Sequence, residues 1–154
     1  MAKSYFFNNI QILEGSKSNL KKENVLIKDG VIKAFGKKAL INAELLGIKP
    51  QKAKNIVLAP CLVDPHSFLE SPFSGKEENI YTLIKKATCA GYGQLGILPR
   101  SNLWRDQIES IIALKTIKSS VSIHLWGGFS LGGKGIALSK HYDLLQNGAI
   151  GLAD

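Results

Sequence analysis

Hydrophobic and polar positions change their pattern near residue 55. Before that point, apolar, aromatic and β-branched residues form short runs that are typical of strands. The predicted elements of this segment are strands at 5–13, 24–28 and 31–35, a short helix at 39–46 and a polar connector at 50–54. Asp29-Gly30 separates two of the runs and predicts a type I′ hairpin turn, because that turn needs a positive φ at both central residues.

After residue 55, short apolar runs alternate with amphipathic segments. The predicted strands are 55–59, 61–63, 94–98, 121–126 and 149–153, and the predicted helices are 77–90, 104–117 and 139–146. In the first helix, Ser74 and Glu77 have the spacing of a capping box, and Gly91 is placed to end the helix. Strands and helices in this rhythm predict parallel βαβ units.

The predicted fold class is α/β, a partial (β/α) barrel after a small β-rich segment. We place the β-rich segment at 1–59 and the first βα units of the barrel at 60–154. Four strands cannot close a barrel, so an open four-stranded sheet is the other arrangement that the pattern allows. Because such a sheet has open edges, we expect the isolated chain to oligomerise or aggregate.

Composition narrows the class of protein and its partners. The 154 residues are 45% hydrophobic and 21% charged, which is typical of globular domains. The net charge of +8 lies mainly in residues 1–59, with 11 lysines against 4 acidic residues. Aromatic residues do not interleave with these lysines, so we expect no nucleic-acid partner. There is no 18-residue apolar run and no secretory signal, which predicts a cytoplasmic protein without a membrane span.

Several smaller features predict ordinary packing. Cys61 and Cys89 fit no paired spacing, and we expect them to be buried thiols in a reducing compartment. His124 is expected to be a hydrogen-bonded core histidine, and His141 to be exposed on a short helix. Trp104 and Trp126 are expected to pack against neighbouring helices, and the glycine-rich loop 127–135 to be a plain connection.

The strongest candidate chemistry follows the apolar run before Asp64. Asp64 and His66 come at the end of a predicted barrel strand, where side chains face the site in this fold. Because strand side chains alternate, residues two apart point to the same side, and a His-x-His pair in that arrangement can bind a metal ion.

Four collinear segments resemble the N-terminal part of dihydroorotases, in the amidohydrolase superfamily. These are Asn24–Gly36, Leu58–Leu69, Glu78–Arg100 and Asn147–Asp154. The resemblance implies a TIM barrel of the metal-dependent hydrolase type, with a small β-sandwich built from both chain ends. It also implies the reversible cyclisation of N-carbamoyl-L-aspartate to dihydroorotate at a zinc centre, a step of pyrimidine synthesis.

The same resemblance marks positions where this chain departs from the family. The first metal-binding histidine corresponds to His66, but the second corresponds to Phe68, which has no donor atom. The substrate-binding arginine corresponds to Glu70, and a substrate-contacting asparagine corresponds to Arg100. Asp154 corresponds to a metal-bridging aspartate of some members. Since catalytic zinc needs three protein ligands, we expect His66 and Asp154 not to bind it stably.

Two functional hypotheses follow from these departures. In the first, the chain is a truncated and catalytically degenerate dihydroorotase-like protein that acts as a scaffold, with aspartate carbamoyltransferase as its partner. In the second, it is half of a split metal-dependent cyclic-amide hydrolase, and a second hydrolase chain supplies the missing ligands.

Overall fold

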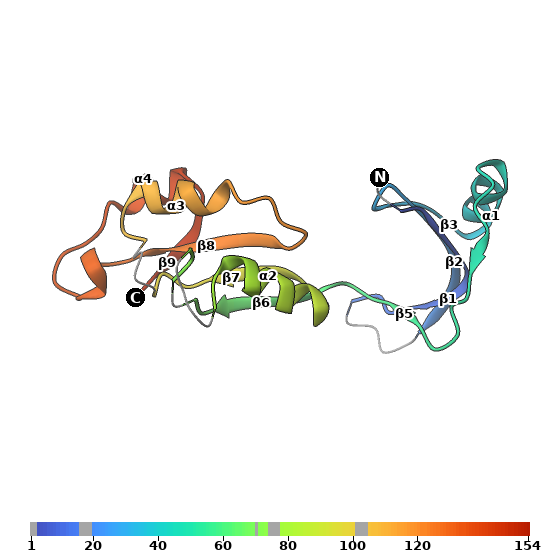
Figure 1. Cartoon of the computed structure of the whole chain (residues 1–154), viewed down its shortest axis with the longest axis horizontal. Helices are drawn as coiled ribbons and strands as arrows, with labels where there is room; N and C mark the ends of the chain where they lie inside the picture. Colours follow the sequence, from blue (N-terminus) through green and yellow to red (C-terminus); the bar gives the residue numbers. More distant parts are fainter. Residues whose placement is uncertain (1–2, 16–19, 70, 74–77, 101–104) are drawn as a thin grey trace. The chain divides into compact units, whose positions relative to one another are not determined.

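The structure is a computed structural model and describes residues 3–15, 20–69, 71–73, 78–100 and 105–154. The chain divides into two compact units, Met1–Pro60 and Cys61–Asp154. Figure 1 shows a β-rich first unit and a second unit of mixed helices and strands. In the part of the chain that is described, no helix is long and apolar enough to span a bilayer.

The first unit is built on one sheet with strand order β3-β2-β1-β4, and β5 also pairs with β1. Its elements are β1 (Tyr5–Ile12), β2 (Lys21–Lys28), β3 (Val31–Phe35), α1 (Gly36–Leu45), β4 (Pro50–Gln51) and β5 (Val57–Leu58). The hairpin prediction is confirmed, since Asp29 and Gly30 have φ values of 54° and 76°. The predicted connector at 50–54 is wrong in part, because Pro50 and Gln51 pair in parallel with β1.

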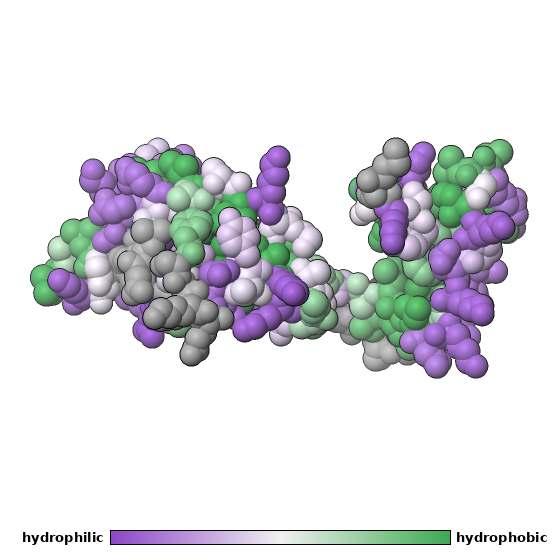
Figure 2. Space-filling view, in the orientation of Figure 1, coloured by the Kyte–Doolittle hydropathy of each residue, from purple (hydrophilic) through white to green (hydrophobic). Residues whose placement is uncertain are grey.

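A β-bulge in β1 divides the packing of this sheet between its two faces. The register with β2 shifts between Phe7 and Ile10, and Asn9 has a φ of 57°, a conformation that asparagine tolerates better than most residues. Phe6 packs with helix α1 in one cluster, whereas Ile10 packs with Val25 in another. On the outer surface of α1, Ile41 and Leu45 stay exposed, and Figure 2 shows this hydrophobic surface.

The second unit is a four-stranded parallel sheet with the sequential order β6-β7-β8-β9. Its elements are β6 (Leu62–Ser67), α2 (Ile80–Cys89), β7 (Tyr92–Ile97), α3 (Ile108–Lys115), β8 (Ser122–Gly128), the 3₁₀ turn η1 (Leu131–Gly133), α4 (His141–Gln146) and β9 (Ala149–Ala153). Parallel strands in sequential order with right-handed crossovers place every helix on the same face of the sheet. Among the described residues the sheet does not close, and β6 and β9 each pair on one side only.

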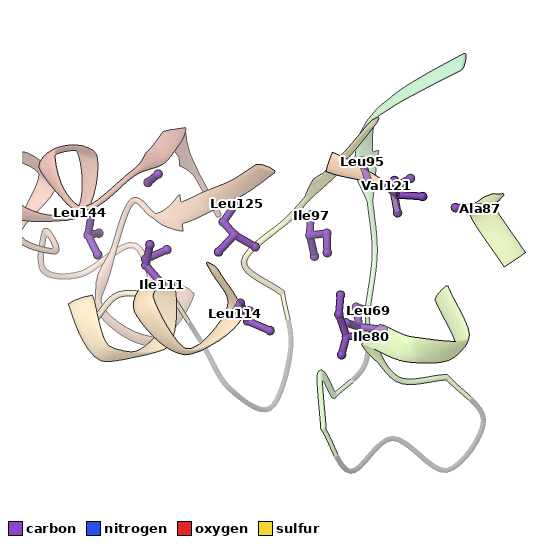
Figure 3. Packing of buried hydrophobic residues seen from close by; sticks show 11 residues of the cluster. Leu69, Ile80, Ala87, Leu95, Ile97, Ile111, Leu114, Val121, Leu125 and Leu144 are labelled. Carbon is purple, nitrogen blue, oxygen red and sulfur yellow. The ribbon is translucent and has the colours of Figure 1, made fainter. Parts of the chain in front are cut away.

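The hydrophobic core of this unit lies between the sheet and its three helices (Figure 3). Its buried members are Leu69, Ile80, Ala87, Leu95, Ile97, Ile111, Leu114, Val121, Leu125, Leu144 and Ala149. Residues from α2, α3 and α4 all contribute, so one apolar layer holds the helices to the sheet. Within the described residues, no helix covers the opposite face of the sheet. On the edge strands β6 and β9, the side chains of Leu62, Val63 and Ile150 are about half exposed.

The helices of the second unit begin later than the sequence pattern predicts. Helix α2 begins at Ile80, and Asn79 and Thr82 form its capping box. The predicted box residues Ser74 and Glu77, like Trp104 at the predicted start of the next helix, lie outside the described residues. Gly91, with a φ of 84°, ends α2 as expected. The prediction of buried cysteines is wrong, because Cys61 and Cys89 are free and exposed.

Candidate functional site

The position of His66 is set by a bulge near the end of β6. In the ladder with β7, Asp64 pairs with Leu95 and Ser67 pairs with Ile97, so two residues of β6 lie opposite the single residue Gly96. A Cβ atom at Gly96 would collide with the backbone oxygen of Pro65 and lie 2.9 Å from its carbonyl carbon. Glycine at this position therefore permits the bulge, and the bulge changes where the following side chain points.

The bulge separates Asp64 from His66, so the prediction that they face the same side is wrong. The Asp64 carboxylate accepts hydrogen bonds from the His66 amide at 3.0 Å and from the Ser67 hydroxyl at 2.6 Å. It lines a cavity of about 210 Å³ together with residues of α2, among them Leu83 and Ala87. Asp64 therefore faces the helices and is fully engaged in local structure.

The ring of Trp126 lies beside the ring of His66, whereas the sequence predicts that Trp126 packs against the helices. The two rings lie 5.6 Å apart between centroids, and the Trp126 indole N–H donates to the Pro65 carbonyl oxygen at 2.9 Å. Gly151 leaves room for the indole, since a Cβ there would lie 2.5 Å from the ring. The prediction that Trp126 packs on the helices is wrong. Leu125 takes that position, and the alternation of strand side chains turns Trp126 to the uncovered face.

Asp154 follows β9 and is held by the loop after β8. Its carboxylate accepts the Ser130 amide at 2.9 Å and the Ser130 hydroxyl at 2.5 Å, and Arg100 Nη2 donates to its backbone oxygen at 3.2 Å. The hydroxyl bond first, and then the amide bond, hold the pKa of the Asp154 carboxyl below its usual range. The Ser130 hydroxyl also accepts the Gly135 amide at 2.9 Å, so the glycine-rich segment is an organised loop fastened to Asp154.

We expect the Asp154–Ser130 contact to weaken in acid. Because the pKa of Asp154 is lowered by folding, its contribution is complete above the ordinary aspartate pKa and is lost as the pH falls through the lowered value. The Ser130 amide resonance in NMR spectra should titrate in that range. It should be unresponsive to acid in Asp154→Asn and respond normally in Asp143→Asn, a control of equal charge change. A normal titration in Asp154→Asn would contradict this assignment.

A buried arginine joins the ends of β7 and β8. Arg105 is fully buried, and its guanidinium donates to the Ile97 oxygen at 2.9 Å and to the Trp126 oxygen at 3.0 Å. Its third nitrogen, Nη1, has no hydrogen-bond partner within the described structure. Burial lowers the pKa of Arg105 to about 10, which leaves the side chain charged at neutral pH. The sequence pattern did not single out Arg105, because nothing in its neighbourhood marks it as buried.

The remaining candidate residues do not join these groups. Phe68 is 56% exposed, and Glu70 lies outside the described residues. His124 makes a hydrogen bond with the Gln94 amide oxygen at 3.1 Å and is half-buried. The ring of His141 is half-buried against Phe129, and Nε2 lies 2.7 Å from the Phe129 carbonyl oxygen, so the prediction of a simply exposed histidine is wrong.

The side chains present do not fit the zinc centre that the resemblance implies. Catalytic zinc takes three protein ligands, and over the described ranges no three histidine, cysteine, aspartate or glutamate side chains are grouped to hold a metal ion. Phe68 offers no donor atom, and both oxygens of the Asp154 carboxylate are engaged by Ser130. Of the three candidate positions in the described part of the chain, His66 alone offers a free donor, since it is exposed near the end of β6.

Sequence comparison finds several dihydroorotases. The chain is 25% identical to a dihydroorotase of Geobacter metallireducens over 134 residues, which are 85% of this chain and 31% of that protein. It is 30% identical to a dihydroorotase of Geobacter sp. (strain M21) over 145 residues, 92% of this chain and 32% of that protein. A probable dihydroorotase-like protein of Synechocystis is 27% identical over 125 residues. No family model matches the chain.

Structural comparison supports the same relationship at the level of the fold. The L-hydantoinase (dihydropyrimidinase) of Arthrobacter aurescens superposes with a TM-score of 0.64 over 96% of this chain and 32% of that protein, at 15% identity. The predicted fold class is therefore confirmed as part of a (β/α) barrel preceded by a β-rich unit. The resemblance to dihydroorotases is also confirmed, and the chain spans about a third of the length of the relatives it matches.

Proposed function

We propose that this dihydroorotase-like chain is catalytically degenerate and acts as a non-catalytic scaffold. The observation that carries the proposal is the donor set at the strand ends. Among the described residues at these positions, His66 has an available imidazole, Phe68 contributes a phenyl ring, and Ser130 holds the Asp154 carboxylate. In dihydroorotases the residues at the corresponding positions bind the zinc ion for the cyclisation of N-carbamoyl-L-aspartate. Because two of these positions cannot serve here, we expect this chain alone to bind zinc weakly and to be inactive.

Charge at the expected substrate positions supports the same proposal. Glu70 stands where the family resemblance implies an arginine for a substrate carboxylate, so the sign of the charge is reversed. Arg100, in place of an asparagine, donates to the backbone of Asp154. Both changes remove groups that would receive the substrate, independently of the missing metal ligand.

The open sheet supports a role in assembly. Strands β6 and β9 pair on one side only among the described residues, and Val63 and Ile150 are 54% and 50% exposed. Unpaired edges and apolar side chains of this kind favour association with another chain. From the family resemblance we propose aspartate carbamoyltransferase as the partner. We place the complex in the cytoplasm, consistent with the free thiols of Cys61 and Cys89.

His66 is the observation that favours a second candidate, half of a split cyclic-amide hydrolase. Its ring is exposed, and among the described residues its nitrogens make no hydrogen bond. A second hydrolase chain that closes the sheet could supply further ligands beside it. In that case Phe68 and Glu70 would lie in a working site with altered substrate preference.

The native complex distinguishes the two candidates. Untagged protein from its own cells should run as an assembly that contains aspartate carbamoyltransferase, hold no stoichiometric zinc, and cyclise no N-carbamoyl-L-aspartate when zinc is added. Turnover above background by the purified chain would contradict the scaffold proposal. Stoichiometric zinc in an assembly with a second hydrolase chain would establish the split enzyme instead.

A pair of variants tests the donor set directly. Phe68→His restores a second imidazole next to His66, and we expect it to retain more zinc than the wild type by about tenfold in affinity. Phe73→His is the matched control, because Phe73 is similarly exposed at 51% but is not at a ligand position. Equal zinc retention by both variants would show that position 68 is not part of a vestigial metal site.

A further inference from the structure

A polar cavity of the first unit lies at a gap in its sheet. Strand β4 pairs with β1 as far as Phe7 with Gln51, and β5 resumes the pairing at Gln11 with Val57. Residues 8–10 of β1 therefore have no ladder partner on this side. The segment 52–56 connects β4 to β5 there, and Ala53 packs against the cluster that contains Ile10. The cavity has a volume of about 350 Å³ and is lined by Asn8, Asn9, Gln11, Lys22, Ala53, Lys54 and Asn55. It opens to solvent, since all of these residues except Gln11 and Ala53 are exposed.

Backbone geometry fixes the walls of this cavity. Asn9 and Asn55 have φ values of 57° and 62°, and they are two of the three non-glycine residues with positive φ in the described chain. The Asn9 amide donates to the Asn24 side-chain oxygen at 2.9 Å, which holds the bulge of β1 in place. Conformations of this kind are costly, and they persist where surrounding contacts hold them. The gap is thus a defined feature of the sheet.

The lining is cationic and rich in amide groups. Lys22 and Lys54 supply two ammonium groups, Asn8, Asn9, Gln11 and Asn55 supply carboxamides, and no acidic side chain lines the cavity. Neither lysine forms an ion pair with a described residue, in contrast to Lys21, which lies 3.1 Å from Glu23. Two unpaired cations beside hydrogen-bond donors are suited to an anion that accepts several hydrogen bonds.

We propose that this cavity binds a small phosphate-bearing anion. The volume lies within the range of small-molecule sites. Lysine binds phosphate as a compact point charge, and the lining places two lysines beside several carboxamide groups that can donate to phosphate oxygens. A ligand with two phosphate groups can engage both ammonium groups while the amides bind its remaining oxygens. This site is separate from the strand ends of the second unit and does not depend on the function proposed for them.

Calorimetric titration of the full chain with pyrophosphate at constant ionic strength tests the proposal. We expect saturable binding that weakens roughly tenfold in Lys22→Gln and in Lys54→Gln, since each removes one charge-assisted contact. Lys38→Gln is the matched control, because it removes the same charge from exposed helix α1 and should leave the affinity unchanged. Asn55→Gly keeps the positive φ while removing the amide, and should weaken binding several-fold.

Three results would overturn the proposal. Pyrophosphate could fail to bind, all three lysine variants could lower the affinity for pyrophosphate equally, or malonate could bind as tightly as pyrophosphate. The second result would mean that the net charge of +8 attracts anions without a defined site. Circular dichroism of each variant establishes that it is folded before its affinity is compared.

Discussion

Replacing Gly96 with alanine should lower the free energy of unfolding of the second unit by about 3 kcal/mol. The new methyl group would meet the backbone of Pro65, so the strain cannot be relieved by rotating a side chain. Relief requires β6 to move away from β7, which removes the bulge and the Pro65 carbonyl that accepts the Trp126 indole. The chain has two tryptophans, Trp104 and Trp126, and both belong to this unit, so their fluorescence in urea measures its unfolding.

Gly127→Ala is the control, on the neighbouring strand β8. A Cβ at Gly127 would lie 3.1 Å and 3.2 Å from the ends of the Leu152 and Leu144 side chains, and these ends can shift without a movement of the backbone. We therefore expect a loss of about 1 kcal/mol or less. Similar losses for the two variants would mean that the bulge opposite Gly96 does not decide the stability of the ladder.

Replacing Arg105 with methionine should also lower the free energy of unfolding by about 3 kcal/mol. Methionine is long and apolar enough to occupy much of the same space, but it leaves the Ile97 and Trp126 carbonyl oxygens without their donors. Methionine carries no charge, so the variant avoids the cost of burying the guanidinium, the same cost that lowers the pKa of Arg105. This gain offsets part of the loss. Urea denaturation followed by tryptophan fluorescence measures the difference.

Arg100→Met provides the comparison for Arg105. Arg100 is exposed and donates one hydrogen bond of 3.2 Å, so its replacement should change stability by less than about 0.5 kcal/mol. If Arg105→Met were as stable as the wild type, the cost of burying the charge would equal what its two hydrogen bonds contribute, as occurs for some buried ionic groups.

The elements of the fold could be predicted because they depend on local patterns. The Asp29-Gly30 turn follows from the φ requirement of the hairpin, and the parallel sheet follows from the alternation of apolar runs with amphipathic helices. The capping residues of α2 were misplaced, because Asn79 with Thr82 and Ser74 with Glu77 have the same spacing in the sequence. Spacing alone cannot decide between two such pairs.

The candidate site was less predictable because it depends on contacts between strands. The side chains of Asp64 and His66 would share a face in a regular strand, but the bulge opposite Gly96 separates them. The position of Trp126 depends on Gly151, which is distant in sequence and leaves space for the ring. The burial of Arg105 likewise depends on two strand ends meeting. These effects depend on which residues of neighbouring strands come close together. The type of a single residue, taken without its neighbours in the sheet, does not predict them.

The sequential strand order of the second unit bears on how the unit forms during synthesis. Each strand pairs with the strand next along the chain, so β6, α2 and β7 can pack as soon as they leave the ribosome, and β8 and β9 can then add in turn. Every added strand closes only the short loop through its own helix, which keeps the entropy cost of each step low. The last strand of the sheet has an unpaired edge at every stage. A nascent chain can therefore pair through this edge with a neighbouring chain on the same polysome.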